Sequence, residues 1–166
     1  MKRRLVASLV TAIMLLTAMS VPTMAAEEST VDASVTVTEV ISITLSDAAP
    51  AGIHFGSVGP DTPSNLDVDS DNTTPSITVD VGSETNVNVD LQIKGTDFSG
   101  TFTVDNAKCS ITYGGTKIPL STDYATIASD IAPGGSQGLW HWLDVPAGTT
   151  AGSYSSTFSY KALTAQ

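Results

Sequence analysis

The chain has 166 residues, a formal net charge of −10 and a single cysteine, and 41% of its residues are hydrophobic. A chain this acidic repels phosphate backbones and anionic lipid headgroups, which excludes nucleic acid as a partner. One cysteine excludes a disulfide framework, so the fold must be stabilised by a hydrophobic core.

Residues 1–26 have the three parts of a secretory signal peptide. Three basic residues stand near the start, Leu5 to Met19 is an uncharged apolar run, and small residues follow. This order predicts a helical signal peptide cleaved after Ala25 or Ala26, and a protein that is secreted, extracellular or held at the cell surface. Cleavage leaves four lysines against 17 acidic residues, a formal charge of −13. No later apolar stretch reaches the ~20 residues that span a membrane.

Residues 27–166 alternate apolar and polar side chains with a period of two. This period predicts a single all-β domain, an antiparallel β-sandwich of eight to ten strands that is immunoglobulin-like or a jelly roll. The early strands are expected at Val31–Leu45, Leu66–Val68, Ile77–Val81 and Val87–Ile93. Because a short Gly-containing turn separates the last two, we expect them to form a hairpin.

The second half of the chain continues with short strands between Gly-containing turns. Apolar positions recur in Phe102–Val104, Cys109–Tyr113, Ile118–Leu120, Leu139–Leu143 and Tyr154–Ala162. Leu139–Leu143 is apolar on both faces, which is typical of a fully buried strand. Asp123–Ile131 is the only segment that fits a helix. Cys109 lies on an apolar face and is expected to be a small buried hydrophobe rather than a reactive thiol.

The C-terminal segment from Trp140 to Tyr154 carries a motif. It reads Trp-x-Trp-Leu-Asp-Val-Pro-Ala-Gly-Thr-x-Ala-Gly-x-Tyr, and Phe158-x-Tyr160 follows. Together with Ile53-His54-Phe55-Gly56 upstream, this layout resembles WxL-type cell-surface domains, whose first WxL strand corresponds to Val87–Phe98. The Trp-x-Leu positions themselves hold Val89-Asp90-Leu91 and Tyr160-Lys161-Ala162 here. The resemblance implies an immunoglobulin-like sandwich on a cell surface, and cell-wall binding is the family's role.

More loosely, the chain is similar to small secreted sandwich subunits of biofilm fibres and archaeal surface pili. In those subunits an N-terminal strand completes the sheet of a neighbour. The alternation Val31–Leu45 covers fifteen residues, whereas strands rarely exceed about ten. Residues 27–38 are therefore a candidate for an extending or donated strand, with Val31, Val35 and Val37 as its interface. The alternatives are one bent strand, or two strands of one domain with a kink at Glu39-Val40.

The densest polar cluster is the acidic segment that contains Asp67, Asp69 and Asp71. Carboxylates at alternate positions can converge on calcium if the backbone turns, whereas an extended segment would be a solvated acidic loop. The spacing does not fit an EF-hand, which requires Gly at the sixth position and Glu at the twelfth. Asn72-Thr73-Thr74 is a sequon and makes Asn72 a candidate glycosylation site.

Two tryptophans, Trp140 and Trp142, are expected on one face of the same strand. Core packing is one role for them, and an exposed platform for sugar rings or a subunit interface is the other. His141 is expected to be packed or hydrogen-bonded, because a metal site would require His54 and a third ligand to meet it.

No nucleophile elbow, HExxH or Walker motif occurs, so the chain is interpreted as a non-enzyme. We expect a structural, assembly or adhesion protein that associates with itself, with other surface proteins or with glycans. The alternative is a carbohydrate- or cell-wall-binding module with a structural calcium site.

Overall fold

The computed structural model describes residues 32–47, 52–100 and 102–166. The predicted signal peptide 1–26 and Val31 lie outside these residues. The chain divides into two compact units, residues 1–36 and residues 37–166. In the first unit, residues 32–36 are exposed and have no regular secondary structure. All the strands found in the described residues belong to the second unit, and no helix in these ranges is long and apolar enough to cross a membrane.

The larger sheet is antiparallel and is centred on the longest strand, β8. Its strands follow the order β1-β3-β8-β5-β6, and β2 pairs with another stretch of β8. They are β1 (Ile43–Asp47), β2 (Thr62–Leu66), β3 (Ile77–Val81), β5 (Ala107–Ser110), β6 (Ile118–Pro119) and β8 (Ser136–Val145). The strand β8 therefore has hydrogen-bonded neighbours along both edges. Leu139 and Leu143 on one of its faces belong to the core, and Trp142 on the other face is covered by Tyr113 and Lys117.

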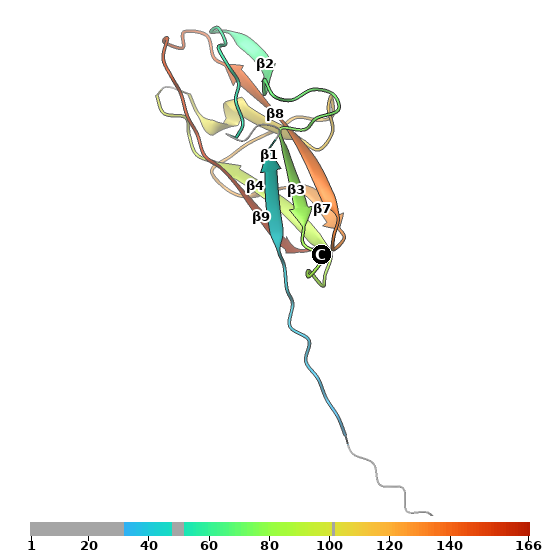
Figure 1. The fold of residues 1–166 in the computed structure, drawn as a ribbon. Helices are drawn as coiled ribbons and strands as arrows, with labels where there is room; N and C mark the ends of the chain where they lie inside the picture. Colours follow the sequence, from blue (N-terminus) through green and yellow to red (C-terminus); the bar gives the residue numbers. More distant parts are fainter. Residues whose placement is uncertain (1–31, 48–51, 101) are drawn as a thin grey trace, which may run out of the picture. The chain divides into compact units, whose positions relative to one another are not determined.

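The smaller sheet has the order β7-β4-β9 and is also antiparallel. It consists of β4 (Val89–Gly95), β7 (Ala125–Ile131) and β9 (Phe158–Thr164). In Figure 1, β1 and β3 of the larger sheet run in front of β4 and β9. A single 3-10 turn, η1 (Val104–Asn106), precedes β5.

The core lies between the two sheets. Alternate residues of β3 and β4 are buried, as the period of a half-buried strand requires. Val79 from the larger sheet and Leu91 from the smaller sheet belong to one buried cluster, together with Cys109 and Leu139. Residues from both sheets share this cluster, so the predicted all-β antiparallel sandwich is confirmed, with nine strands in the part of the chain that is described.

The predicted hairpin of residues 77–81 and 87–93 is wrong. The two segments form β3 and β4, which belong to different sheets. Their apolar faces are both buried because they face the same core from opposite sides. A period of two identifies each strand but cannot distinguish a hairpin from a crossing between sheets.

Three further element predictions need correction. Asp123–Ile131 is not helical, because Ala125–Ile131 forms β7. Phe102–Val104 is not a strand, and the turn η1 begins at Val104. The N-terminal alternation forms a strand only over Ile43–Asp47. By contrast, β5 and β6 pair with each other around the predicted Gly114-Gly115 turn.

Candidate functional site

The N-terminal segment is the first candidate interface. Residues 32–40 are all exposed and none of them belongs to a strand. Val35 and Val37 are 87% and 76% exposed, although they form an apolar face. The structure therefore leaves two of the three predicted interface valines uncovered, and the third, Val31, lies outside the described residues.

Asn86 fixes the place where this segment joins the sandwich. Its side-chain oxygen accepts a hydrogen bond from the Val40 backbone N–H at 2.9 Å, and its amide donates to the Thr38 carbonyl at 2.9 Å. The Asn86 backbone N–H donates to the Val40 carbonyl at 3.2 Å. The Thr164 hydroxyl also donates to the Glu39 carboxylate. These bonds begin at Thr38, the residue at which the predicted extending segment 27–38 ends.

The two tryptophans hold loops against the outer face of β8. The indole N–H of Trp140 donates to the Asp71 carbonyl at 2.7 Å. The Trp142 ring packs against Tyr113, with ring centroids 6.5 Å apart, and Lys117 Nζ lies 4.6 Å from the centre of the Trp142 ring. Trp142 is only 4% exposed, so the two rings do not form an open platform.

The acidic segment divides into a buried and an exposed part. Asp67 is 1% exposed, and its carboxylate accepts hydrogen bonds from the backbone N–H of His54 at 3.1 Å and from the Ser70 hydroxyl at 3.0 Å. Asp69 and Asp71 are exposed. The described residues contain no group of three or more His, Cys, Asp or Glu side chains that could hold a metal. The described residues do not gather these three carboxylates into such a group, and the calcium site stays a prediction.

Asp71 instead organises its own turn. Its Oδ1 atom accepts hydrogen bonds from the Thr73 and Thr74 backbone N–H groups, both at 2.7 Å, and from the Thr73 hydroxyl at 2.8 Å. These bonds lower the pKa of Asp71 to about 2, and the Thr73 hydroxyl makes the largest contribution to the shift. Asn72 is exposed in this turn, so the structure leaves the predicted glycosylation position accessible.

His141 is a polar residue inside the core. It is fully buried, its Nε2 lies 3.1 Å from the Tyr160 hydroxyl, and its ring stacks on Phe158 with centroids 5.7 Å apart. Burial lowers the pKa of His141 to about 3, and the charge of Asp67 opposes this shift only in part. The neutral ring therefore connects β8 of one sheet to β9 of the other.

Cys109 is paired across the strands with His141 and is fully buried. Burial raises the pKa of its thiol to about 12, so the nucleophilic thiolate is absent at neutral pH. The expectation of a small buried hydrophobe is confirmed.

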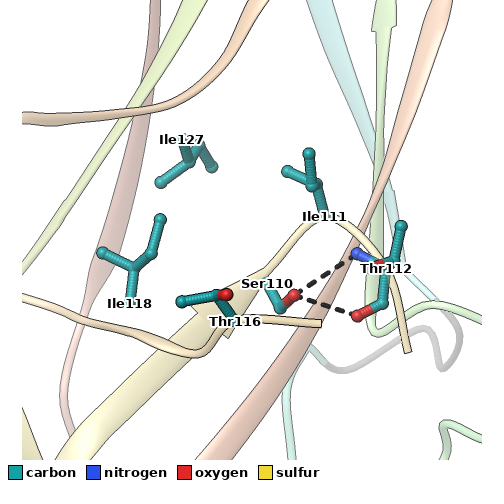
Figure 2. Close-up of a pocket in the computed structure, with 6 residues that line it drawn as sticks. All are labelled: Ser110, Ile111, Thr112, Thr116, Ile118 and Ile127. Carbon is teal, nitrogen blue, oxygen red and sulfur yellow. Dashed lines mark hydrogen bonds between the residues drawn. The ribbon is translucent and has the colours of Figure 1, made fainter. Parts of the chain in front are cut away.

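Two shallow hollows open on the surface. The first measures about 310 Å³, and Figure 2 shows Ile111, Ile118 and Ile127 around it. The Ser110 hydroxyl at its rim donates to the Thr112 carbonyl at 2.9 Å and accepts from the Thr112 N–H at 3.4 Å, so it is engaged in the local turn. The second measures about 380 Å³ and lies on the outer face of the smaller sheet, where Leu163 and Gln92 contribute to its lining.

The sequence interpretation missed a basic and aromatic patch beside the second hollow. Lys94 Nζ and Lys161 Nζ lie 4.7 Å and 5.5 Å from the centre of the Tyr124 ring. Two of the four lysines that follow residue 26 therefore gather on one aromatic ring. Only the pairing of β4 with β9 reveals this, because the two lysines are far apart in the sequence.

The fold and these features define a small all-β protein with two antiparallel sheets, an exposed N-terminal segment and no open aromatic platform on β8. The chain matches no protein-family model, no curated protein and no solved structure.

Proposed function

We propose that this chain is a structural or adhesion protein of the cell surface that associates with itself through its N-terminal segment. The observation that carries the proposal is the alternating segment before β1, which exposes Val35 and Val37 and forms no strand in its own copy. A neighbouring sheet edge would give this segment the backbone hydrogen bonds that it lacks as a strand.

Burial of the valines supplies the driving force. Full burial of a valine side chain stabilises a complex by about 1.5–3 kcal/mol. Val35 and Val37 are 87% and 76% exposed, so nearly all of this free energy is still to be gained. The gain must exceed the entropy lost when the extended segment becomes ordered, which costs about 1–2 kcal/mol for each residue. Each new backbone hydrogen bond along the segment adds about 0.5–1.5 kcal/mol.

Secretion is part of the same proposal. The order of charges and apolar residues in 1–26 is that of a signal peptide, and every described strand lies within residues 27–166. Cleavage after Ala25 or Ala26 would place the segment at the new N-terminus, free to reach a neighbour. The formal charge of −13 that remains favours solubility outside the cell.

A pair of matched double variants of residues 27–166 tests the proposal. Val35→Asp with Val37→Asp places two charges on the apolar face, whereas Ser34→Asp with Thr36→Asp places the same two charges on the polar face. Sedimentation velocity should show oligomers of the unchanged chain and of the polar-face variant, and monomers of the apolar-face variant. An unchanged chain that is monomeric at all concentrations, or equal association of both variants, would contradict the proposal.

The alternative of a sugar-binding platform has less support. Trp142 is 4% exposed beneath Lys117 and Tyr113, so it offers no ring face to a sugar. The indole N–H of Trp140 donates to the Asp71 carbonyl, so it is not available to a sugar hydroxyl.

A further inference from the structure

We infer that the free edge of β9 in a second copy of this chain accepts the N-terminal segment. This inference rests on the proposed function and names its acceptor. In the described part of the chain, β9 pairs only with β4, and all seven residues of β9 pair without a shift in register. A regular edge strand is a template for another strand.

The other edges are less suitable. The pairing of β7 with β4 has two register shifts, and Asp130 in β7 has a φ of 60°. Bulges of this kind bend an edge and hinder further pairing. The edge strand β6 has two residues, one of them Pro119, which has no N–H to donate. The edge strands β1 and β2 have only five residues each, and the pairing of β2 with β8 has a register shift.

The backbone of β9 directs alternate groups toward its open side. The Ala165 N–H donates to the Asn88 carbonyl, and the Thr96 N–H donates to the Thr157 carbonyl. Given the register of the two strands, the odd-numbered residues of β9 are therefore the ones hydrogen-bonded to β4. Residues at even positions of β9, such as Phe158 and Ala162, therefore direct their backbone groups away from β4.

The core is incompletely covered along this edge. Phe158 and Tyr160 pack against the buried cluster but remain only half-buried. Their partners in β4, such as Ile93, are buried. A strand added beside β9 with its valines directed inward would cover the exposed parts of these rings, because neighbouring strands place same-face side chains in contact.

Charge fixes which face of the added strand is directed outward. In a strand, Asp32 lies on the face opposite to Val35 and Val37. Inward valines therefore place Asp32 on the outer face, where Lys161 is exposed and Lys94 shares the Tyr124 ring. The acidic side chain of the added strand would thus lie beside Lys94 and Lys161, the basic patch of an otherwise acidic chain. The strand comes from a second copy, as the proposed self-association requires.

Crosslinking between two marked copies tests the acceptor. One copy of residues 27–166 carries Val35→Cys and the other carries Ala162→Cys, and a short bismaleimide joins thiols that are in contact. The native Cys109 is buried and its pKa is raised to about 12, so it does not compete. Matched acceptors carry Leu45→Cys on β1 or Ala125→Cys on β7, because these residues, like Ala162, pair with a buried residue of the neighbouring strand. If Ala162→Cys does not fold, the pair Ser34→Cys and Ser159→Cys, both on the outward face of their strands, replaces the first pair.

We expect roughly tenfold more heterodimer with Ala162→Cys than with either matched acceptor, because contact raises the effective thiol concentration to the millimolar range. An equal or greater yield with Leu45→Cys or Ala125→Cys, while association persists, would overturn the β9 assignment and leave the proposed function intact. Loss of both association and crosslinking would overturn both.

Charge reversal at Lys161 tests the placement of Asp32. Lys161→Glu should weaken association roughly two- to fivefold, the effect of one exposed ion pair, and Asp32→Lys in the same chain should restore it. Lys117→Glu is the matched control, because it makes the same charge change beside Trp142 in the larger sheet, away from β9. Equal effects of the two lysine variants, or no restoration by Asp32→Lys, would contradict the placement of Asp32 beside Lys161.

Discussion

The pH dependence of stability should originate mainly from His141. Burial lowers the pKa of its ring from 6.5 to about 3, so the folded chain keeps the ring neutral. The unfolded chain binds a proton there as the pH falls below 6.5. The full contribution of the neutral ring is therefore present above pH 6.5 and is lost progressively as the pH falls toward 3.

The size of this loss follows from the two pKa values. Each pH unit between them costs about 1.36 kcal/mol, so the free energy of unfolding should fall by about 2 kcal/mol between pH 8 and pH 5. Asp71, Glu84 and Asp144 also have lowered pKa values, but carboxylates with lowered pKa values lose their contribution only near and below pH 4.5. The window from pH 8 to pH 5 therefore isolates the histidine.

Urea unfolding at a series of pH values measures the effect. The Val35→Asp, Val37→Asp background removes the contribution of self-association. His141→Gln should abolish the slope between pH 8 and pH 5, whereas His54→Gln, which changes the exposed histidine, should keep it. Equal slopes for the unchanged chain and His141→Gln would refute the reasoning. An NMR titration in which the His141 ring protonates near pH 6.5 in the folded protein would refute it as well.

Three further predictions concern packing and reactivity. Trp140→Phe removes the hydrogen bond to the Asp71 carbonyl, so chemical unfolding should show a loss of about 1 kcal/mol, and an unchanged stability would contradict the loop-holding role. Leu139→Ala should lower the free energy of unfolding, measured with urea, by about 2–5 kcal/mol because it leaves a cavity, whereas the same change at the partly exposed Leu163 should lower it by less than about 1 kcal/mol. Comparable losses for the two variants would show that the core is not where the structure places it. Cys109 should react with a thiol reagent at pH 8 only after urea unfolds the chain, and fast reaction of the folded protein would contradict its burial.

The sequence predicted the fold class because a period of two is a local signal. Alternate side chains of Ile77–Val81 and Val89–Gly95 point into the core, so each strand could be recognised by itself. Which strands pair is not local, and the same pattern fits a hairpin or a crossing between sheets. The helix expected at Asp123–Ile131 failed for a related reason, because pairing with β4 overrides the weak local preference of β7.

The candidate sites divide in the same way. Exposure of Val35 and Val37 could be proposed from the length of the alternation, because that length exceeds one strand. The different burial of Asp67 and Asp71 could not be predicted, because Asp67 accepts a hydrogen bond from the backbone N–H of His54, 13 residues away, whereas Asp71 is bonded within its own turn. Nor could the sequence place Lys161 beside Lys94, since that depends on the register of β9 against β4.

Electron microscopy of purified residues 27–166 tests the central claim most directly. The account predicts filaments or discrete oligomers of the unchanged chain, and isolated particles of the Val35→Asp, Val37→Asp variant at the same concentration. Isolated particles of both chains, or identical assemblies of both, would contradict the claim that the exposed valine face of the N-terminal segment joins one copy to the next.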